Sequence, residues 1–345
     1  MPQMIRARAP LRLGLAGGGT DVSPYTELHG GAVMNVTINR YAYAMLERLD
    51  APGLRLESVD LETAETLPLA PRLPLEGPHR IARAVYNRIV ADHCGGQAQA
   101  LRIATFSEAP AGSGLGSSSA IVVALVQAFA ELLSLPLGEY DVAHLAYVIE
   151  REDMAQHGGR QDQYAATFGG FNFMEFHADD RVIVNPLKIR AEVANELEAR
   201  ILLCFTGVSR ESAAIIAEQS RNVSAGASKS IEAMHAIKAQ AVAMKEALLR
   251  GNFERLAATL REGWVQKRAM ADGISNRHIE AVQAAAMEEG AYAGKISGAG
   301  GGGFMMLLVP LERRRALTAR LEGMGCRLEN CAFTHEGATA WRVAG

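Results

Sequence analysis

The sequence has few cysteines, and none of them form a pair at metal-binding spacing. Its 345 residues include Cys94, Cys204, Cys326 and Cys331, with no C-x-x-C pair, and its nine histidines show no zinc-site spacing. A disulfide framework and a zinc centre are therefore not expected. The cysteines instead predict reduced thiols in a cytosolic protein.

A charge excess and long apolar runs are also missing. The net charge is −3 and the basic residues are scattered, so there is no electrostatic case for a nucleic-acid partner. The first residues lack a basic-then-apolar signal segment. The longest apolar stretch, residues 120–133, is interrupted by Gln127 and Glu131 and is too short to span a bilayer. We therefore expect a cytoplasmic protein that binds neither nucleic acid nor membrane.

The most informative feature that is present is a glycine- and serine-rich run, PAGSGLGSSS, at residues 110–119. A strand-like stretch at 101–106 precedes it, and an apolar pattern toward Leu133 follows, which predicts a strand, a loop and a helix. Glycines let backbone N–H groups converge on one point, and the start of the helix adds free N–H groups and a positive dipole end. The run thus predicts a phosphate-binding loop, with serine oxygens suited to Mg²⁺. A glycine-rich turn before a buried helix is the alternative. The expected nucleotide-binding residues are Pro110, Gly112, Ser113, Gly114, Leu115, Gly116, Ser117, Ser118 and Ser119.

A second glycine cluster, KISGAGGGG, occupies residues 295–303. Gly298, Gly300 and Gly303 formally match the dinucleotide fingerprint, but an apolar strand-like run follows where the fingerprint needs a helix. A Walker loop and the protein-kinase motifs are absent. So many glycines imply a close backbone approach to a ligand or to the opposite domain. A mobile linker between strands is the other interpretation.

The order of predicted elements indicates an α+β protein of two domains, because strands and helices mix without strict βαβ alternation. We place the division within residues 190–200, giving domains 1–195 and 196–345. Expected strands cover 5–15, 32–49, 101–106, 171–176, 182–189, 200–205, 291–296, 303–309, 328–333 and 339–343. Expected helices cover 80–92, 137–156, 211–221, 230–250, 253–270, 277–289 and 311–324.

Three segments, taken in order, resemble the three motifs of the GHMP kinases. They are APLR with GGGTD at residues 9–21, the run 110–119, and the cluster 295–303. The resemblance implies an N-terminal domain like the second domain of ribosomal protein S5 and a ferredoxin-like C-terminal domain. It also implies ATP at the 110–119 loop and a substrate between the domains.

The finer pattern at residues 12–21, 159–164 and 205–210 is most similar to the family's kinases for D-glycero-D-manno-heptose 7-phosphate. This similarity implies ATP- and Mg²⁺-dependent phosphorylation of the anomeric hydroxyl of that sugar phosphate to the 1,7-bisphosphate. Two alternatives stay open. One is another sugar 1-kinase of the family, for L-fucose or galactose, and the other is a ligand-binding protein of this fold without catalysis.

The resemblance also implies catalytic roles. Asp162, in its Gln-Asp-Gln setting, corresponds to the family's catalytic base, although aspartate also suits a helix N-cap. Arg12 matches a basic position that would keep a nearby carboxylate ionised. Candidate Mg²⁺ ligands are Ser118 and Glu150, with Ser117 and Glu152 as alternatives.

Substrate contacts are expected on both sides of the cleft. Asp21 corresponds to a sugar-hydroxyl ligand, and arginine or lysine would bind the phosphate of the substrate. The methionine- and alanine-rich helices of the second half fit either a core or a homodimer face. The expected substrate-binding residues are Gly18, Gly19, Thr20, Asp21, Arg160, Arg210, Lys295, Ser297, Gly298 and Gly300.

Overall fold

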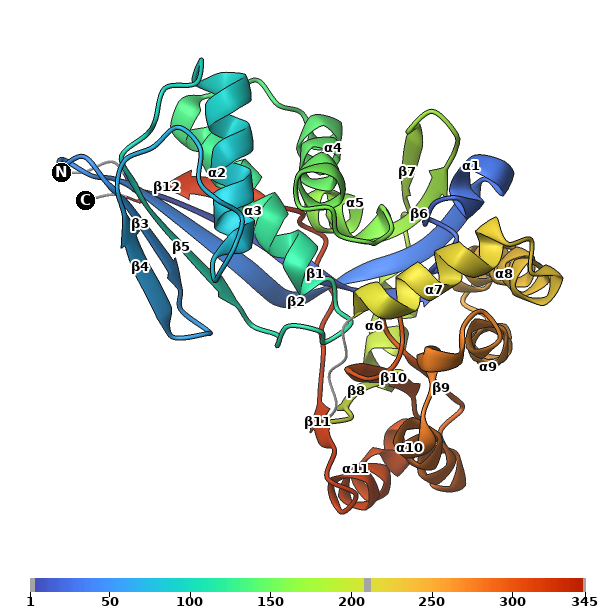
Figure 1. The fold of residues 1–345 in the computed structure, drawn as a ribbon. Helices are drawn as coiled ribbons and strands as arrows, with labels where there is room; N and C mark the ends of the chain where they lie inside the picture. Colours follow the sequence, from blue (N-terminus) through green and yellow to red (C-terminus); the bar gives the residue numbers. More distant parts are fainter. Residues whose placement is uncertain (1–3, 208–211, 344–345) are drawn as a thin grey trace.

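The computed structural model describes residues 4–207 and 212–343, which form two β-sheets with helices packed on them (Figure 1). The strands are β1 (Met4–Ala16), β2 (Gly31–Arg48), β3 (Leu54–Ser58), β4 (Thr63–Leu67), β5 (Leu101–Ser107), β6 (Phe171–Phe176), β7 (Val182–Pro186), β8 (Ile201–Phe205), β9 (Ala293–Ile296), β10 (Phe304–Leu308), β11 (Arg327–Glu329) and β12 (Thr339–Arg342). The α-helices are α1 (Tyr25–His29), α2 (Arg80–His93), α3 (Ser117–Leu133), α4 (Glu139–Val148), α5 (Gln161–Phe168), α6 (Ala191–Arg200), α7 (Ser212–Ser224), α8 (Ser228–Arg250), α9 (Phe253–Arg268), α10 (Arg277–Glu288) and α11 (Arg314–Glu322).

The first sheet is built around the long strand β2, which pairs with β6 over its first half and with β5 over its second. The strand order is β12-β1-β2-β5-β3-β4, with β6 and β7 beside the start of β2. Strand β1 runs antiparallel to β2, and the register shifts between Pro10 and Leu11. Proline lacks the N–H that a regular ladder needs, so a bulge is where it fits.

Helix α3 is the central helix of this half and packs on β1 and β2. Its sequence is apolar on nearly every side, and twelve of its residues are buried, from Ser117 to Leu132. A helix that is apolar all round belongs inside a core. The phosphate-binding loop predicted from the sequence therefore leads into a helix that is held rigidly by the first sheet.

The second sheet has the antiparallel order β11-β8-β10-β9. Strand β8, a set of helices, the pair β9–β10, helix α11 and strand β11 follow one another as the ferredoxin-like expectation requires. Strand β12 then returns to the first sheet and pairs with β1. The division at residue 195/196 remains a prediction, and this final strand lies with the N-terminal sheet.

Most predicted elements are present, and the α+β class is confirmed. The helix expected over 137–156 is shorter, because α4 ends at Val148 and a π-helical turn, Ile149–Asp153, follows it. Helix α6 and the hairpin β3–β4 were not predicted. No helix in the described part of the chain is long and apolar enough to cross a membrane.

Candidate active site

A cavity of about 710 Å³ joins the sequence motifs. Its walls come from the end of β1 and the loop after it, from the run that leads into α3, and from the segment between α4 and α5. Helices α7 and α9 and the second glycine cluster complete it. This volume suits a pair of small polar ligands, since ligand pockets in proteins are typically about 300–1,000 Å³.

The start of α3 forms one wall of the cavity. Gly116, directly before the helix, adopts a left-handed conformation with φ of 77°, and no side chain caps the helix. Residues Ser117, Ser118 and Ser119 line the cavity in the first turn, where backbone N–H groups have no partner inside the helix. This end of α3 is therefore suited to binding an anion.

The second glycine cluster packs directly against this loop. A Cβ on Gly298 would lie 2.7 Å from the Cα of Gly114, and a Cβ on Gly303 would lie 2.4 Å from the carbonyl oxygen of Ser113. The Ser297 hydroxyl donates to the Gly114 carbonyl at 3.0 Å. The predicted close backbone approach is confirmed for Ser113 and Gly114 of the first loop, and the cluster is also the connection between β9 and β10.

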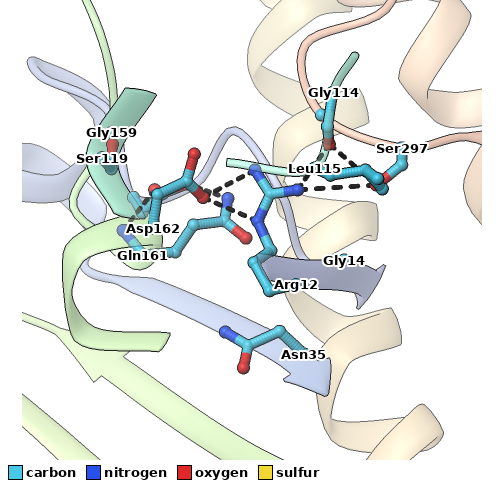
Figure 2. A network of polar contacts seen from close by, with 12 residues as sticks. Arg12, Gly14, Asn35, Gly114, Leu115, Ser119, Gly159, Gln161, Asp162 and Ser297 are labelled. Carbon is cyan, nitrogen blue, oxygen red and sulfur yellow. Dashed lines mark hydrogen bonds and ion pairs between the residues drawn. The ribbon is translucent and has the colours of Figure 1, made fainter. Parts of the chain in front are cut away.

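Arg12 and Asp162 form an ion pair inside the cavity (Figure 2). Nε of Arg12 donates to Oδ1 of Asp162 at 2.7 Å, and Nη1 of Arg12 donates to the Gly114 carbonyl at 2.6 Å. Arg12 comes from β1 and is 4% exposed, so its orientation is fixed by the sheet. One arginine thus connects the carboxylate of α5 to the backbone of the 110–119 loop, which the sequence predicts to bind phosphate.

Asp162 does not cap α5, because the helix begins at Gln161 and Asp162 lies in its first turn. Asp21 takes the capping position instead. Its Oδ2 accepts from the backbone N–H groups of Arg160 and Gln161, each at 3.0 Å, and its Oδ1 accepts from the N–H of Gly19 at 3.1 Å. Asp21 therefore ties the loop after β1 to the start of α5, and it lines the cavity from there.

Ser118 and Glu150 meet across the cavity. The Ser118 hydroxyl donates to Oε1 of Glu150 at 3.0 Å, and the side chain of Gln163 donates to Oε2. Glu150 lies in the π-helical turn and is 1% exposed, whereas Glu152 is exposed and does not line the cavity. Short π-helical segments often mark functional sites, and this one aims a carboxylate at the phosphate loop.

Comparison with known proteins identifies the family. The model for the GHMP kinases N terminal domain matches residues 80–170, and the model for the GHMP kinases C terminal domain matches residues 244–324. A D-glycero-alpha-D-manno-heptose 7-phosphate kinase from Campylobacter jejuni is 45% identical over 98% of this chain and 99% of its own. The chain belongs to the GHMP kinase family.

Two further relatives place it among sugar kinases of that family. A crystal structure of a D-glycero-D-manno-heptose 1-phosphate kinase from Bacteroides thetaiotaomicron superposes with a TM-score of 0.84 at 39% identity, covering 99% of this chain and all of the other. An L-fucokinase/L-fucose-1-P guanylyltransferase from Bacteroides fragilis is 26% identical over 89% of this chain and 34% of its own length. The predicted two-domain GHMP kinase fold and the prediction of a kinase are confirmed, and the family implies ATP as the phosphoryl donor.

The cations predicted to bind the substrate phosphate of this GHMP kinase have other partners. The Arg160 guanidinium is 5% exposed and pairs with Glu27 at 3.0 Å and Asp180 at 2.6 Å, away from the cavity lining. Nζ of Lys295 donates to the backbone carbonyls of Gly14 and Leu15, and burial holds its pKa well below the usual value. Arg210 lies outside the described residues. The structure therefore assigns neither Arg160 nor Lys295 to the cavity.

The other predicted residues divide into cavity walls and supports. Gly18, Gly19, Gly112, Gly114, Gly116 and Gly298 line the cavity, whereas Pro110, Ser113, Leu115, Thr20, Ser297 and Gly300 do not. Thr20, for example, is buried, and its hydroxyl donates to the carbonyls of Gly17 and Ala32. The supporting residues hold the loops in the positions that the lining residues need.

Sequence reasoning missed several cavity residues, notably Arg80, Arg151, Gln219 and Lys267. Lys267 is the most informative, because it is 6% exposed and its ammonium donates to the Gly298 carbonyl. It continues the buried face of α9 after Leu260 and Trp264, at spacings of four and three residues. A lysine on an otherwise apolar helix face was the available signal.

Proposed function

We propose that this GHMP kinase transfers the terminal phosphoryl group of ATP to the anomeric hydroxyl of D-glycero-D-manno-heptose 7-phosphate, giving the 1,7-bisphosphate. The observation that carries the proposal is the Arg12–Asp162 ion pair, bonded to the Gly114 carbonyl of the phosphate loop. It places a base and a cation at the boundary between an anion-binding helix end and the rest of the cavity.

In the proposed reaction, Asp162 accepts the proton of the anomeric hydroxyl. The acceptor oxygen forms a bond to the terminal phosphorus, the bond from that phosphorus to the bridging oxygen breaks, and ADP leaves with the electron pair. Arg12 holds the Asp162 carboxylate in its orientation and offsets negative charge beside the transferred group. Such transfer depends mainly on positioning and charge neutralisation, which the rigid β1, α3 and α5 supply.

The Ser118–Glu150 pair fits a magnesium ion. A hydroxyl and a carboxylate oxygen 3.0 Å apart are hard oxygen donors beside the phosphate loop, and Mg²⁺ usually takes one or two protein oxygens together with phosphate and water. When bound, the ion would neutralise charge on the nucleotide phosphates. Gln163 and the π-helical turn keep Glu150 turned toward Ser118.

The acceptor is proposed from the relatives. The Campylobacter protein is named for a 7-phosphate substrate, whereas the Bacteroides structure is described as a 1-phosphate kinase. These names place the phosphate at opposite ends of the sugar. The segments 12–21 and 159–164 resemble heptose 7-phosphate kinases, and Arg12, Asp21 and Gln161 from these segments line the cavity around Asp162. This similarity supports attack by the anomeric hydroxyl.

A panel of acceptors tests the proposal. Heptose 7-phosphate, heptose 1-phosphate, L-fucose and galactose are each incubated with the enzyme, ATP and Mg²⁺. ADP release is measured, and phosphorus NMR locates the new phosphate. The proposal predicts ADP release with heptose 7-phosphate and a new anomeric phosphate signal. A preference for heptose 1-phosphate, L-fucose or galactose would assign a different acceptor.

A further inference from the structure

Lys267 is an unusual residue for the interior of a cavity wall. It is 6% exposed, and no described carboxylate lies within ion-pair distance of its ammonium. Within residues 4–207 and 212–343, its ammonium donates only to the carbonyl of Gly298. A buried ammonium without a counter-charge is destabilising, and two of its three N–H groups have no partner among those residues.

The other cations of the cavity are already engaged. Among the described residues, the arginines that line it are Arg12, Arg80 and Arg151. Arg12 is bonded to Asp162 and Gly114, and Arg80 donates to the Met154 carbonyl. Arg151 donates to the Gly159 carbonyl at 3.1 Å. Arg80 keeps further free N–H groups but is exposed to solvent, whereas Lys267 is buried, so Lys267 is the buried lining cation that lacks an ion pair among the described residues.

Lys267 lies on the cavity wall next to the second glycine cluster. Its partner Gly298 packs on Gly114 of the phosphate loop, and Lys267 also borders a small adjoining cavity lined by Gly17 and Gly18. The ammonium of Lys267 is therefore next to the contact between the second glycine cluster and the 110–119 loop, in the same cavity as Asp162.

The charged groups around Lys267 come from four elements. Arg12 on β1 and Lys295 on β9 are cations, and Asp162 on α5 and Asp21 after β1 are anions. Asp162 is paired with Arg12, and Asp21 is held by backbone N–H groups, so neither neutralises Lys267 through an ion pair. The surroundings favour an incoming anion.

We propose that Lys267 is a catalytic residue whose ammonium binds a nonbridging oxygen of the phosphoryl group during its transfer. The proposal rests on the proposed kinase function and adds a second cation to Arg12 in the cavity wall. In the transfer step, Lys267 forms no covalent bond and keeps its proton. It stabilises the negative charge on the phosphoryl oxygens in the transition state, because these oxygens are less well solvated in the cavity than in water.

The protonation state of Lys267 supplies an independent readout. The pKa of this ammonium is lowered to about 8, chiefly by burial and also by Arg12, while Asp21 and Asp162 act in the opposite direction. Because the protonated form binds the phosphoryl group, kcat/KM should fall as pH rises above this pKa. A bound phosphate raises the pKa of a neighbouring ammonium, so the corresponding fall in kcat should lie at higher pH.

Three variants test the proposal. Lys267→Gln keeps a donor for the Gly298 carbonyl but removes the charge, Lys267→Arg keeps the charge, and Lys229→Gln changes an exposed lysine at the start of α8. We expect kcat of Lys267→Gln to fall roughly 10²–10³-fold, as when one transition-state donor is lost, with ADP affinity nearly unchanged by calorimetry. Lys267→Arg should retain part of the activity, and its kcat/KM should no longer decrease above pH 8. Lys229→Gln should match the wild type.

Several results would overturn this role. The first is a wild-type kcat in Lys267→Gln. The second is a Lys267→Gln variant in which only KM for the sugar phosphate changes. The third is a Lys267→Arg variant whose kcat/KM falls above pH 8 as in the wild type. If Lys267→Gln does not fold, as judged by thermal melting, the pH profile of Lys267→Arg decides alone. A wild-type enzyme that is inactive toward every acceptor contradicts the proposed function, whereas an active wild type with an equally active Lys267→Gln contradicts only the role of Lys267.

Discussion

The backbone of Gly159 lies against the carboxylate of Asp21, so close that a Cβ at position 159 would be 1.9 Å from Oδ2 of Asp21. This contact lets Asp21 accept hydrogen bonds from the first N–H groups of α5, the helix that carries Asp162. The absence of a side chain at Gly159 is therefore part of what positions the proposed base.

Gly159→Ala should displace Asp21 and with it the start of α5. We expect a lower melting temperature and a loss of kcat/KM of roughly 10²-fold, because small misplacements at a reacting centre have effects of this order. Gly53→Ala is a matched control, since the nearest atom to its Cβ would be at an ordinary contact distance of 3.7 Å. Kinetics and thermal melts of the two variants, measured in parallel, test the contact; equal behaviour would show that it has no such role.

Asp162→Asn should abolish most turnover while leaving nucleotide binding intact. A neutral amide cannot take the proton of the acceptor hydroxyl, so kcat should fall roughly 10²–10⁴-fold. The dissociation constant of ADP, measured by calorimetry, should change little, because asparagine keeps the shape of the side chain and the N–H groups at the start of α3 are unchanged. Near-normal turnover would remove Asp162 from the role of base and favour a non-catalytic role for the ion pair.

Glu150→Gln should raise the magnesium concentration that gives half-maximal activity. The variant keeps a side-chain oxygen near Ser118 but loses the negative charge that a hard cation prefers. Glu152→Gln, two residues along the same π-helical turn but exposed, provides the control. Magnesium titrations of kcat are the measurement, and an effect in Glu152→Gln instead of Glu150→Gln would exchange the two assignments.

The second glycine cluster should tolerate loss of a hydrogen bond better than gain of a side chain. Ser297→Ala removes one bond to the Gly114 carbonyl, an effect of about 1 kcal/mol on the free energy of unfolding. At Gly300, φ is 116°, and a Cβ would lie 2.8 Å from the Ile274 carbonyl oxygen. Gly300→Val should therefore be severely impaired in folding or activity, and wild-type melting and kinetics in that variant would contradict the packing described.

Arg160→Ala should affect stability more than substrate choice. Its guanidinium pairs with Glu27 and Asp180 and lies over the Tyr147 ring, so its removal should lower the free energy of unfolding by roughly 1–3 kcal/mol. The ratio of activities on heptose and heptose 7-phosphate should stay at the wild-type value. A selective loss of the phosphorylated substrate would instead return Arg160 to the role predicted from the sequence.

The parts of the site that sequence predicted best are those built from backbone. A loop such as 110–119 needs glycines at fixed positions before an apolar helix, and this requirement is visible in the chain itself. The same holds for the cluster at 295–303, whose glycines pack on Ser113 and Gly114. The glycine pattern alone therefore indicates that both motifs approach a ligand or another part of the backbone closely.

Side-chain partners were harder to predict, because they depend on packing between distant elements. Arg160 was expected to face a phosphate, but Glu27 and Asp180 lie within ion-pair distance and hold it elsewhere. Lys267 carries no motif, and only its place on the buried face of α9 brings it into the cavity. The π-helical turn that orients Glu150 likewise has no signature in a helical apolar pattern.

The central claim is that Asp162 and Arg12 drive phosphoryl transfer to the anomeric oxygen of a heptose phosphate. The most direct measurement is phosphorus NMR of heptose 7-phosphate incubated with ATP, Mg²⁺ and either the wild type or Asp162→Asn. The account predicts a second, anomeric phosphate signal with the wild type and almost none with the variant over the same time. An anomeric phosphate formed equally well by both proteins, or a wild-type product phosphorylated at another position, would contradict it.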